Sequence, residues 1–253
     1  MVLGFYSPDN LDVAPSLLAI ASFSVLRKEK RVLIINATNK EYDLEQSLGI
    51  PNESLLQEVG IDYLFRSLKV NKLTRESIEN AALSFHNNRL HILTASSRII
   101  EVFREDVQKE LIAIVRTVRE YYDVVLVHLD SKATLETWEK LIECCDKVVL
   151  NLSQNKRKVD SWVSVTEEKR DKFIYYIDKY DVNSFYNLKN LARKLPHKVV
   201  GIQYETSYYD SLYRGNVIEY MEKENLSRRK IWCSFLDKVE PTYKVLLQGE
   251  EDK

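Results

Sequence analysis

The sequence is poor in cysteine and histidine. Three cysteines occur among 253 residues, of which Cys144 and Cys145 are adjacent and Cys233 is remote. This arrangement suits neither a disulfide framework nor a zinc site. The four histidines show no metal-ligand spacing. We therefore expect no metal ion and no structural disulfide, as is usual in cytoplasmic proteins.

The chain also lacks a long apolar stretch and an excess of one charge. No segment approaches the roughly 20 apolar residues of a membrane-spanning helix. The opening MVLGFYS has no charged region of the kind that begins a signal peptide. The net charge is −1, which excludes a global attraction to nucleic acid or to an anionic membrane. We expect a cytoplasmic protein with no nucleic-acid partner and no direct membrane insertion, peripheral at a membrane only through partners.

Short apolar runs rich in β-branched residues alternate with segments of helical periodicity. Most of the runs lack polar alternation, as expected of strands covered on both faces of a parallel sheet. The expected strands are 2–7, 31–36, 89–94, 122–129, 147–152, 172–178 and 198–204. The clearest expected helices are 14–28, 106–120, 133–144 and 183–195. This pattern predicts an α/β fold with a doubly wound, mainly parallel sheet of about seven strands and helices on both faces.

Two regions depart from the alternation. Residues 43–88 hold short helical stretches, 54–59 and 61–68, between the second and third expected strands. The tail 225–253 carries apolar residues at helical spacing, and we expect it to form a helix and tail docked on the rest of the chain. These apolar residues are Leu226, Ile231, Trp232, Phe235 and Leu236. Because no linker-like composition interrupts the chain, we assign 1–253 to a single domain.

The first strand-to-helix loop, residues 7–16, reads SPDNLDVAPS and contains no glycine and no lysine. In an open α/β sheet, ligands bind beyond the carboxyl ends of the strands, so a phosphate site would include this loop. A phosphate cradle needs glycines for close backbone approach and a lysine for the phosphates. Asp9 and Asp12 are instead negative, and Pro15 removes a backbone amide from the start of the helix. The loop is predicted to reject a triphosphate.

Despite this loss, the segment 2–36 resembles the opening of the MinD/ParA-type P-loop ATPases, the group with a deviant Walker A motif. The family pattern is roughly SPKGGVGKTT, then an alanine- and leucine-rich helix, then KRVLLID. This chain keeps SP at 7–8 and KRVL at 30–33. Later segments are also similar to the family, in order, at 121–131, 145–154, 177–181 and 198–221. Residues 60–96 look most like the CpaE/TadZ branch, whose members serve pilus assembly.

The resemblance implies which residues stand at the family's nucleotide site, and nearly all of them differ from the family. Asp9 replaces the signature lysine, Ala14 the P-loop lysine and Pro15 the magnesium-binding threonine. The other replacements are Asn10, Leu11 and Val13 for glycines, Asn36 and Thr38 for two aspartates, His128 for the Walker B aspartate, and Asp178 for an asparagine near the base. The resemblance therefore implies the family's fold without its ATPase residues.

The first functional hypothesis is a non-catalytic pseudo-ATPase without a cofactor, which acts as a scaffold or localisation protein in pilus or secretion-machine assembly. Family members dimerise through the nucleotide face. The resemblance therefore implies self-association, or binding of a related assembly protein, through the same face. Asp9 and Asp12 belong to this face. The tyrosines Tyr204, Tyr208 and Tyr209 either extend the interface or are partly buried around a short helix.

Two alternatives remain open. His128 beside Asp130 is either the general base of an enzyme that has reused the emptied site, with Asn36 nearby, or a polar strand end. A residual nucleotide binder would keep base contacts around Asp178. The basic run at 156–158 is expected to be a short solvated turn.

Overall fold

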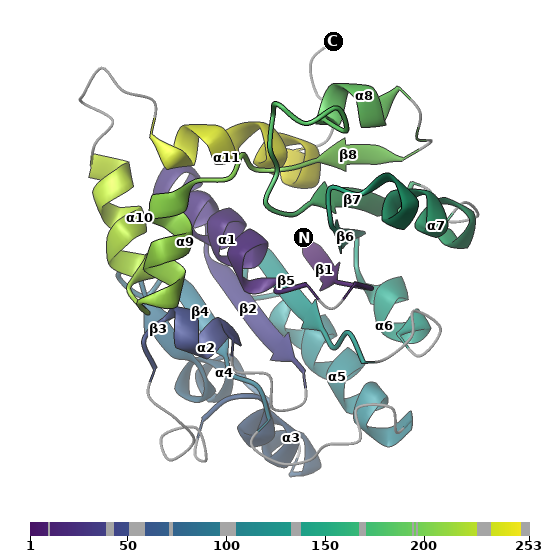
Figure 1. The fold of residues 1–253 in the computed structure, drawn as a ribbon. Helices are drawn as coiled ribbons and strands as arrows, with labels where there is room; N and C mark the ends of the chain where they lie inside the picture. The colour runs from purple at the N-terminus through teal and green to yellow at the C-terminus, as the bar shows by residue number, and fades with distance from the viewer. Residues whose placement is uncertain are drawn as a thin grey trace.

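A central β-sheet organises the fold (Figure 1). The computed structural model describes residues 1–9, 11–38, 43–50, 59–70, 73–96, 105–132, 138–166, 171–193, 195, 197–226 and 234–248. The strands are β1 (Val2–Tyr6), β2 (Val32–Ala37), β3 (Leu83–Phe85), β4 (Leu90–Leu93), β5 (Val124–Leu129), β6 (Lys147–Leu152), β7 (Phe173–Ile177) and β8 (Lys198–Val200). They form one 8-stranded sheet in the order β3-β4-β2-β5-β1-β6-β7-β8.

The sheet confirms the predicted mainly parallel α/β fold. Each expected strand is present, although the last one ends early, at Val200. The additional strand is β3, which pairs antiparallel with β4 at one edge of the sheet. Its three residues, Leu-Ser-Phe, are too few to show a periodic pattern in the sequence.

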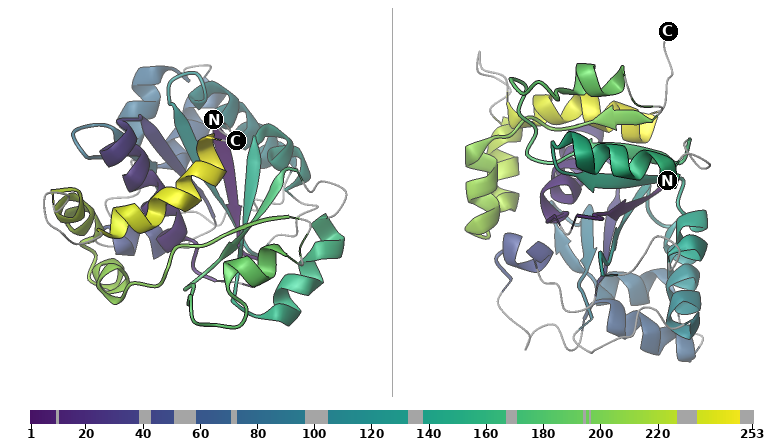
Figure 2. Two further views of the ribbon diagram at one scale, coloured as in Figure 1. Left: turned by 90° about the horizontal axis from the view of Figure 1, so that it is seen from above. Right: turned by 45° about the vertical axis from the view of Figure 1, so that its right-hand side comes forward.

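Helices cover both faces of the sheet, as the sequence predicts (Figures 1 and 2). One layer comprises α1 (Ala14–Lys28), α2 (Asp43–Ser47), α9 (Thr206–Tyr213), α10 (Val217–Leu226) and α11 (Phe235–Tyr243). The other comprises α3 (Ile61–Lys69), α4 (Arg75–Ala81), α5 (Glu105–Val118), α6 (Glu139–Cys144), α7 (Lys156–Thr166) and α8 (Leu188–Ala192). In β2, Val32 and Ile34 pack on the first layer and Leu33 and Ile35 on the second. A strand buried on both sides requires such an uninterrupted apolar run.

The helix expected at 183–195 is shorter in the structure, where α8 begins at Leu188. Asn187 causes this start, because its side-chain oxygen accepts a hydrogen bond from the backbone N–H of Asn190 at 3.0 Å. The preceding residues form turns, and Phe185, expected on the buried side of a helix, is 69% exposed. The periodicity was therefore misleading for the first third of this segment.

Other expected segments fall partly outside the described residues. Residues 54–58 of the expected stretch 54–59, and the pair Ile231 and Trp232, lie outside them. The helix expected at 133–144 is seen as α6 from Glu139, and residues 133–137 are not among those described. The helix expected at 61–68 is confirmed as α3.

The C-terminal segment packs on the sheet domain through α11. Phe235 and Leu236 are buried in the same cluster as the apolar residues of α1. After α11 the chain continues as a π-helix over Lys244–Gln248. Lys147, at the start of β6, donates hydrogen bonds from Nζ to the carbonyls of Val245 and Leu246, both at 2.9 Å. None of the helices in the described part of the chain is long and apolar enough to cross a membrane.

A pair of glycines brings α2 close to the turn between α9 and α10. Gly49 and Gly215 have φ angles of 68° and 70°, in the left-handed region that favours glycine. A Cβ atom on Gly215 would lie 2.6 Å from the Cα of Gly49 and 2.9 Å from the carbonyl oxygen of Gln46. Both the backbone conformation and the available space therefore require glycine at position 215.

We predict that Gly215→Ala lowers the free energy of unfolding by about 3 kcal/mol, from the left-handed conformation and the steric overlap together. For a chain of this length the midpoint of thermal unfolding should fall by roughly 6–12 °C. Differential scanning calorimetry measures this change. Arg214→Ala, at the exposed neighbouring residue with φ of −86°, is the matched control. An equal loss in both variants would refute the packing argument.

Candidate functional site

The first loop connects β1 to α1 at the carboxyl edge of the sheet, next to the ends of β5 and β6. Its polar groups are satisfied within the chain. The buried hydroxyl of Ser7 accepts a hydrogen bond from the N–H of Leu11 at 2.8 Å and donates one to the carbonyl of Asn151 at 3.3 Å. Asn10 lies outside the described residues. The loop is thus folded around its own hydroxyl and backbone groups.

The start of α1 is occupied by a carboxylate of the chain itself. The N–H of Ala14, the first residue of the helix, donates to Oδ1 of Asp12 at 2.8 Å. Pro15 has no N–H, and both Val13 and Ala14 are only 1% exposed. The positive end of a helix dipole attracts an anion. Here that anion is Asp12, at the place where a P-loop would hold phosphate.

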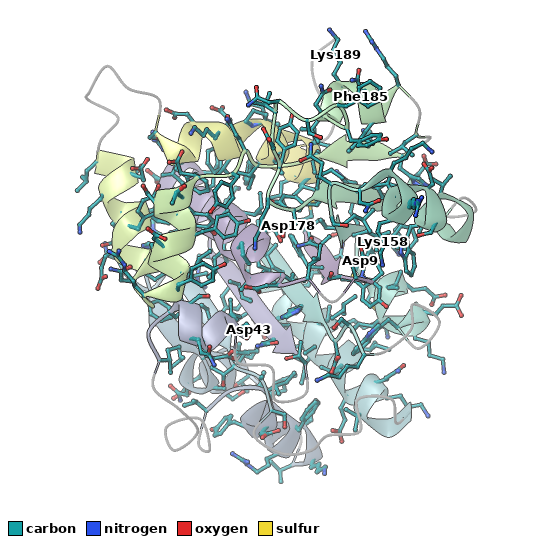
Figure 3. The ribbon with its side chains drawn as sticks, in the orientation of Figure 1. Asp9, Asp43, Lys158, Asp178, Phe185 and Lys189 are labelled. Carbon is teal, nitrogen blue, oxygen red and sulfur yellow. The ribbon has the colours of Figure 1, made fainter. Side chains whose placement is uncertain are left out.

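Asp9 is neutralised inside the chain. Its carboxylate is 7% exposed and lies 2.9 Å from Nζ of Lys158 on α7, and Figure 3 shows the two residues next to each other. The hydroxyl of Ser153 donates to the other carboxylate oxygen at 3.4 Å. The basic run at 156–158 is exposed to solvent, as expected, but it forms the first turn of α7, and its Lys158 forms an ion pair with the first loop.

The residues after β2 form a buried hydrogen-bond network. The hydroxyl of Thr38 donates to Oδ1 of Asn36 at 2.8 Å, and Nδ2 of Asn36 donates to both oxygens of Glu45 at 3.2 Å. The N–H of Ala95 donates to Glu45 Oε1 at 2.8 Å. Glu45 is 1% exposed, and burial raises the pKa of its carboxyl. The network ties α2 to the ends of β2 and β4.

Sequence analysis did not identify Glu45. A glutamate on a five-residue helix in a polar stretch carries no signal of burial. The signal that could have revealed it is the replacement of the family's two aspartates by Asn36 and Thr38. These two residues can donate hydrogen bonds, so they can hold a carboxylate where aspartates would hold a metal ion.

A small acidic cavity lies between the first loop and the end of β5. Its volume is about 210 Å³, and it is lined by Leu11, Asp12, Val13, Asp43, His128, Ser131 and Lys132. Partial burial, with Asp43 and Asp178 nearby, raises the pKa of Asp12 to about 6. Asp12 is exposed at the rim, so water screens much of this effect. The cavity is smaller than the roughly 300–1,000 Å³ of most small-molecule sites.

His128 faces this cavity as a buried, neutral residue. It aligns with Phe5 of β1 and Asn36 of β2, and burial lowers the pKa of its ring to about 4. Its Nδ1 has no hydrogen-bond partner in the described part of the chain. Asp130 instead closes a turn, because its Oδ1 accepts from the N–H of Lys132 at 2.8 Å. A group with such a low pKa is a weak general base at neutral pH.

The tyrosines near the end of β7 differ in exposure. Tyr208 and Tyr209 are 2% and 6% exposed, whereas Tyr204 is 43% exposed and stacks on Tyr209 with a centroid distance of 4.9 Å. The hydroxyl of Tyr209 donates to Asp178 at 3.1 Å, and that of Tyr208 to the carbonyl of Pro15 at 2.5 Å. Of these tyrosines only Tyr204 offers surface for an interface. Tyr208 and Tyr209 instead tie α9 to β7 and α1.

These contacts show which expected site residues come together. Ser7, Asp9, Asp12, Asn36, His128 and Asp178 all lie at the carboxyl edge of the sheet, on β1, β2, β5, β7 or the residues that follow them. Apart from His128, each has a hydrogen bond or an ion pair with another group of the chain. Within the described residues, no group of three or more His, Cys, Asp or Glu side chains is arranged to hold a metal ion.

Comparison with solved structures identifies the fold. A ParA family ATPase from Chlorobium tepidum TLS is 14% identical with a TM-score of 0.67, over 93% of this chain and 97% of that chain. The cell division protein MinD of Aquifex aeolicus is 16% identical with a TM-score of 0.66, over 100% and 98%. The MinC:MinD cell division complex of the same organism matches at 16% identity and a TM-score of 0.65, over 100% and 97%.

Comparison of the sequence with protein-family models gives no match, and comparison with curated proteins gives none either. The relationship is therefore visible in the arrangement of helices and strands and not in the overall sequence. The chain has the fold of the MinD/ParA ATPases.

The environment of His128 predicts a pH-dependent stability. Because burial lowers its pKa from 6.5 to about 4, His128 binds more protons in the unfolded chain than in the folded chain below pH 6.5. The free energy of unfolding therefore falls as the pH falls from about 6.5 through 4, by an amount on the order of 3 kcal/mol from this group. We predict that His128→Leu removes this part of the decline.

Urea unfolding of both proteins between pH 4 and pH 7 measures the difference. The comparison isolates His128, because His86, His91 and the buried carboxyls are common to both proteins. The ring proton resonances of His128 should titrate near pH 4. Titration near pH 6.5 with identical pH profiles for both proteins would contradict the prediction.

Proposed function

We propose that this chain is a non-catalytic pseudo-ATPase, which keeps the MinD/ParA fold and uses it as a scaffold for other proteins. The observation that carries the proposal is the hydrogen bond from the N–H of Ala14 to Asp12. A protein carboxylate there takes the position and the charge of the phosphate that a P-loop binds. The partners that Asp9, Asp12 and Asn36 have within the chain also support a site that does not need a nucleotide.

Electrostatics around the first loop support the same conclusion. Asp12 and Asp43 line the cavity, and the charges of Asp43 and Asp178 both act on Asp12. A unit negative charge about 4 Å from another costs about 4 kcal/mol at an effective dielectric of 20. The only lysine that lines the cavity in the described part of the chain is Lys132. A triphosphate would therefore meet repulsion from carboxylates without the glycines and the lysine that normally offset it.

The first test is calorimetric titration with Mg-ATP. We expect no saturable binding, and a dissociation constant below about 10 μM would contradict the proposal. Asp12→Asn combined with Asp43→Asn is an informative variant, because it removes two repelling charges but restores neither glycines nor lysine. We expect it also to bind no ATP. Tight binding by this variant alone would show that charge, and not the shape of the loop, excludes the nucleotide.

Protein partners follow from the scaffold proposal. MinD of Aquifex aeolicus forms a complex with MinC, which is an example of the fold acting through a protein partner. For this chain we propose self-association, or binding of a related assembly protein, through the face that carries the first loop and the ends of β1 and β5. The resemblance of 60–96 to the CpaE/TadZ branch supports a role in pilus or secretion-machine assembly, with the protein at the membrane only through its partners.

The internal pair of Asp9 and Lys158 refines this interface. Because Lys158 neutralises Asp9, the face is less acidic than the sequence alone suggests. The unpaired acidic charge is concentrated at Asp12 and Asp43 around the cavity. A second copy or a partner would meet these two residues with lysine or arginine.

We predict that the protein self-associates at micromolar concentration without nucleotide, and that Asp9→Lys weakens the association. The substitution places a lysine beside Lys158 at the proposed interface. Light scattering gives the mass relative to the 29.7 kDa chain. Asp171→Lys makes the same charge change at an exposed residue just before β7, at the opposite edge of the sheet, and should have no effect. A strictly monomeric protein that recovers no partner would refute the interface.

A further inference from the structure

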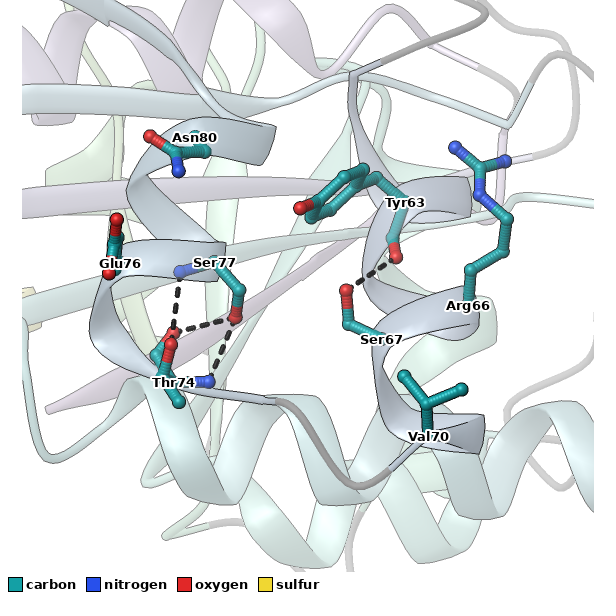
Figure 4. A pocket seen from close by; sticks show the side chains of 8 residues that line it. All are labelled: Tyr63, Arg66, Ser67, Val70, Thr74, Glu76, Ser77 and Asn80. Atoms are coloured by element: carbon teal, nitrogen blue, oxygen red, sulfur yellow. Dashed lines mark hydrogen bonds between the residues drawn. The ribbon is translucent and has the colours of Figure 1, made fainter.

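A second cavity lies away from the first loop, between α3 and α4 (Figure 4). Its volume is about 490 Å³, and it is an open groove between two antiparallel helical walls. The residues lining it are Tyr63, Arg66, Ser67 and Val70 on one side and Thr74, Glu76, Ser77 and Asn80 on the other. We call this feature the α3–α4 groove.

Both walls of the groove are held rigidly. The hydroxyl of Ser67 donates to the carbonyl of Tyr63 at 3.0 Å within α3. At the start of α4, Thr74 and Ser77 form a reciprocal capping box, with hydrogen bonds of 3.2 and 2.8 Å. On the side facing the sheet, Leu64 of α3 and Ile78 of α4 are fully buried. The groove is therefore preformed, which lowers the entropy cost of binding.

Two of the lining residues, Tyr63 and Val70, contribute apolar surface to the groove. The ring of Tyr63 points across the groove toward α4 (Figure 4), and Val70, at the end of α3, is 62% exposed. The exposed Val70 and the half-buried Tyr63 together give this concave surface an apolar area. A docked apolar side chain would bury this surface, and that burial would contribute favourable free energy to binding.

The charges of this helical hairpin divide into two groups. Outside the groove they are paired, since Glu79 accepts hydrogen bonds from Arg75 and Arg31, both at 2.8 Å. Arg66 has no ion pair among the described residues, and its guanidinium lies 5.9 Å from the ring centre of Tyr63. Lys69, one turn further on, is also exposed and without an ion pair in that part of the chain. The α3 wall therefore offers positive charge beside an aromatic ring.

The opposite wall determines on which side a docked partner can carry acidic residues. Glu76, in the first turn of α4, is exposed and is stabilised there by the helix dipole. A partner with acidic groups on both sides would be repelled by Glu76, whereas one with a carboxylate only on the α3 side would pair with Arg66. Guanidinium groups bind carboxylates in a bidentate manner. The amide of Asn80 can accept or donate a hydrogen bond beside them.

We propose that the α3–α4 groove docks a short amphipathic helix of a partner protein, with its apolar stripe on Tyr63 and Val70 and a glutamate or aspartate on Arg66. Helices of nine and seven residues, at 1.5 Å per residue, give the groove a length of roughly 10–14 Å, enough for about two turns of a docked helix. Such a small contact supports a weak, reversible complex. The proposal adds a partner-binding site to the scaffold function and rests on that function.

The test uses the full chain and a fluorescent synthetic peptide of about 14 residues, near the length at which isolated helices begin to form in water. The peptide carries leucines in one helical stripe, glutamates along one flank and lysines along the other. We expect fluorescence anisotropy to show saturable binding, and amide chemical shifts to change on α3 and α4. A peptide with lysines on both flanks should bind at least about tenfold more weakly.

Matched variants distinguish specific docking in the groove from non-specific binding of the peptide. Val70→Asp and Arg66→Glu should each weaken binding of the glutamate peptide at least about tenfold. Val182→Asp is the control, because Val182 is also an exposed valine, at 47%, but lies after β7 and outside the groove. Circular dichroism checks that all three variants remain folded, and surface positions make this the expected result.

Several outcomes would overturn the proposal. These are equal binding of the two peptides, shift changes located elsewhere, or an equal effect of Val182→Asp. Binding to the groove by a chain that also bound Mg-ATP tightly would refute the pseudo-ATPase assignment and leave the docking site standing. A chain that bound neither ATP nor the peptide would refute the docking site and leave the pseudo-ATPase assignment standing.

Discussion

The structure depends on one constraint at the carboxyl edge of its sheet, where the polar groups at the strand ends and at a helix terminus need hydrogen-bond or charge partners. In the fold's nucleotide-binding relatives a phosphate can meet this requirement. Here the carboxylate of Asp12 accepts a hydrogen bond from the start of α1, Lys158 forms an ion pair with Asp9, and Glu45 accepts hydrogen bonds from Asn36. Because a buried polar group without a partner costs about 1–3 kcal/mol, these contacts stabilise this edge of the sheet.

Much of the fold could be predicted from the sequence because burial on both faces of a strand leaves an uninterrupted apolar run. The run 31–36 and the helix 14–28 are examples that the structure reproduces closely. The prediction failed where short side-chain contacts decide the backbone. The expected helix begins at Asn183, but the cap at Asn187, four residues later, starts α8. The three residues of β3 form a strand because they pair with β4. Neither effect changes the apolar periodicity.

The candidate site was predictable in its losses and not in its replacements. The absence of glycine and lysine from 7–16 is visible in the sequence, since it concerns residue types at known spacing. The partners that took over, Lys158 and Glu45, are distant from the first loop along the chain and become neighbours only through the sheet order. The same holds for Tyr208, whose burial follows from its stacking on Phe235 with a centroid distance of 4.2 Å. Long-range contacts of this kind leave no local pattern.

The packing of α1 against α11 has a consequence for how the chain folds during its synthesis. Helix α1 starts at residue 14 and α11 ends at residue 243, and Phe23 of the first lies 4.7 Å, between ring centres, from Tyr243 of the second. This layer of the core is incomplete until nearly the whole described chain has left the ribosome. The opposite layer, from α3 to α8, is encoded in between and can assemble earlier on the sheet. The part of the α1 surface that packs on α11 therefore remains uncovered for most of translation, a period in which such surfaces are prone to aggregate.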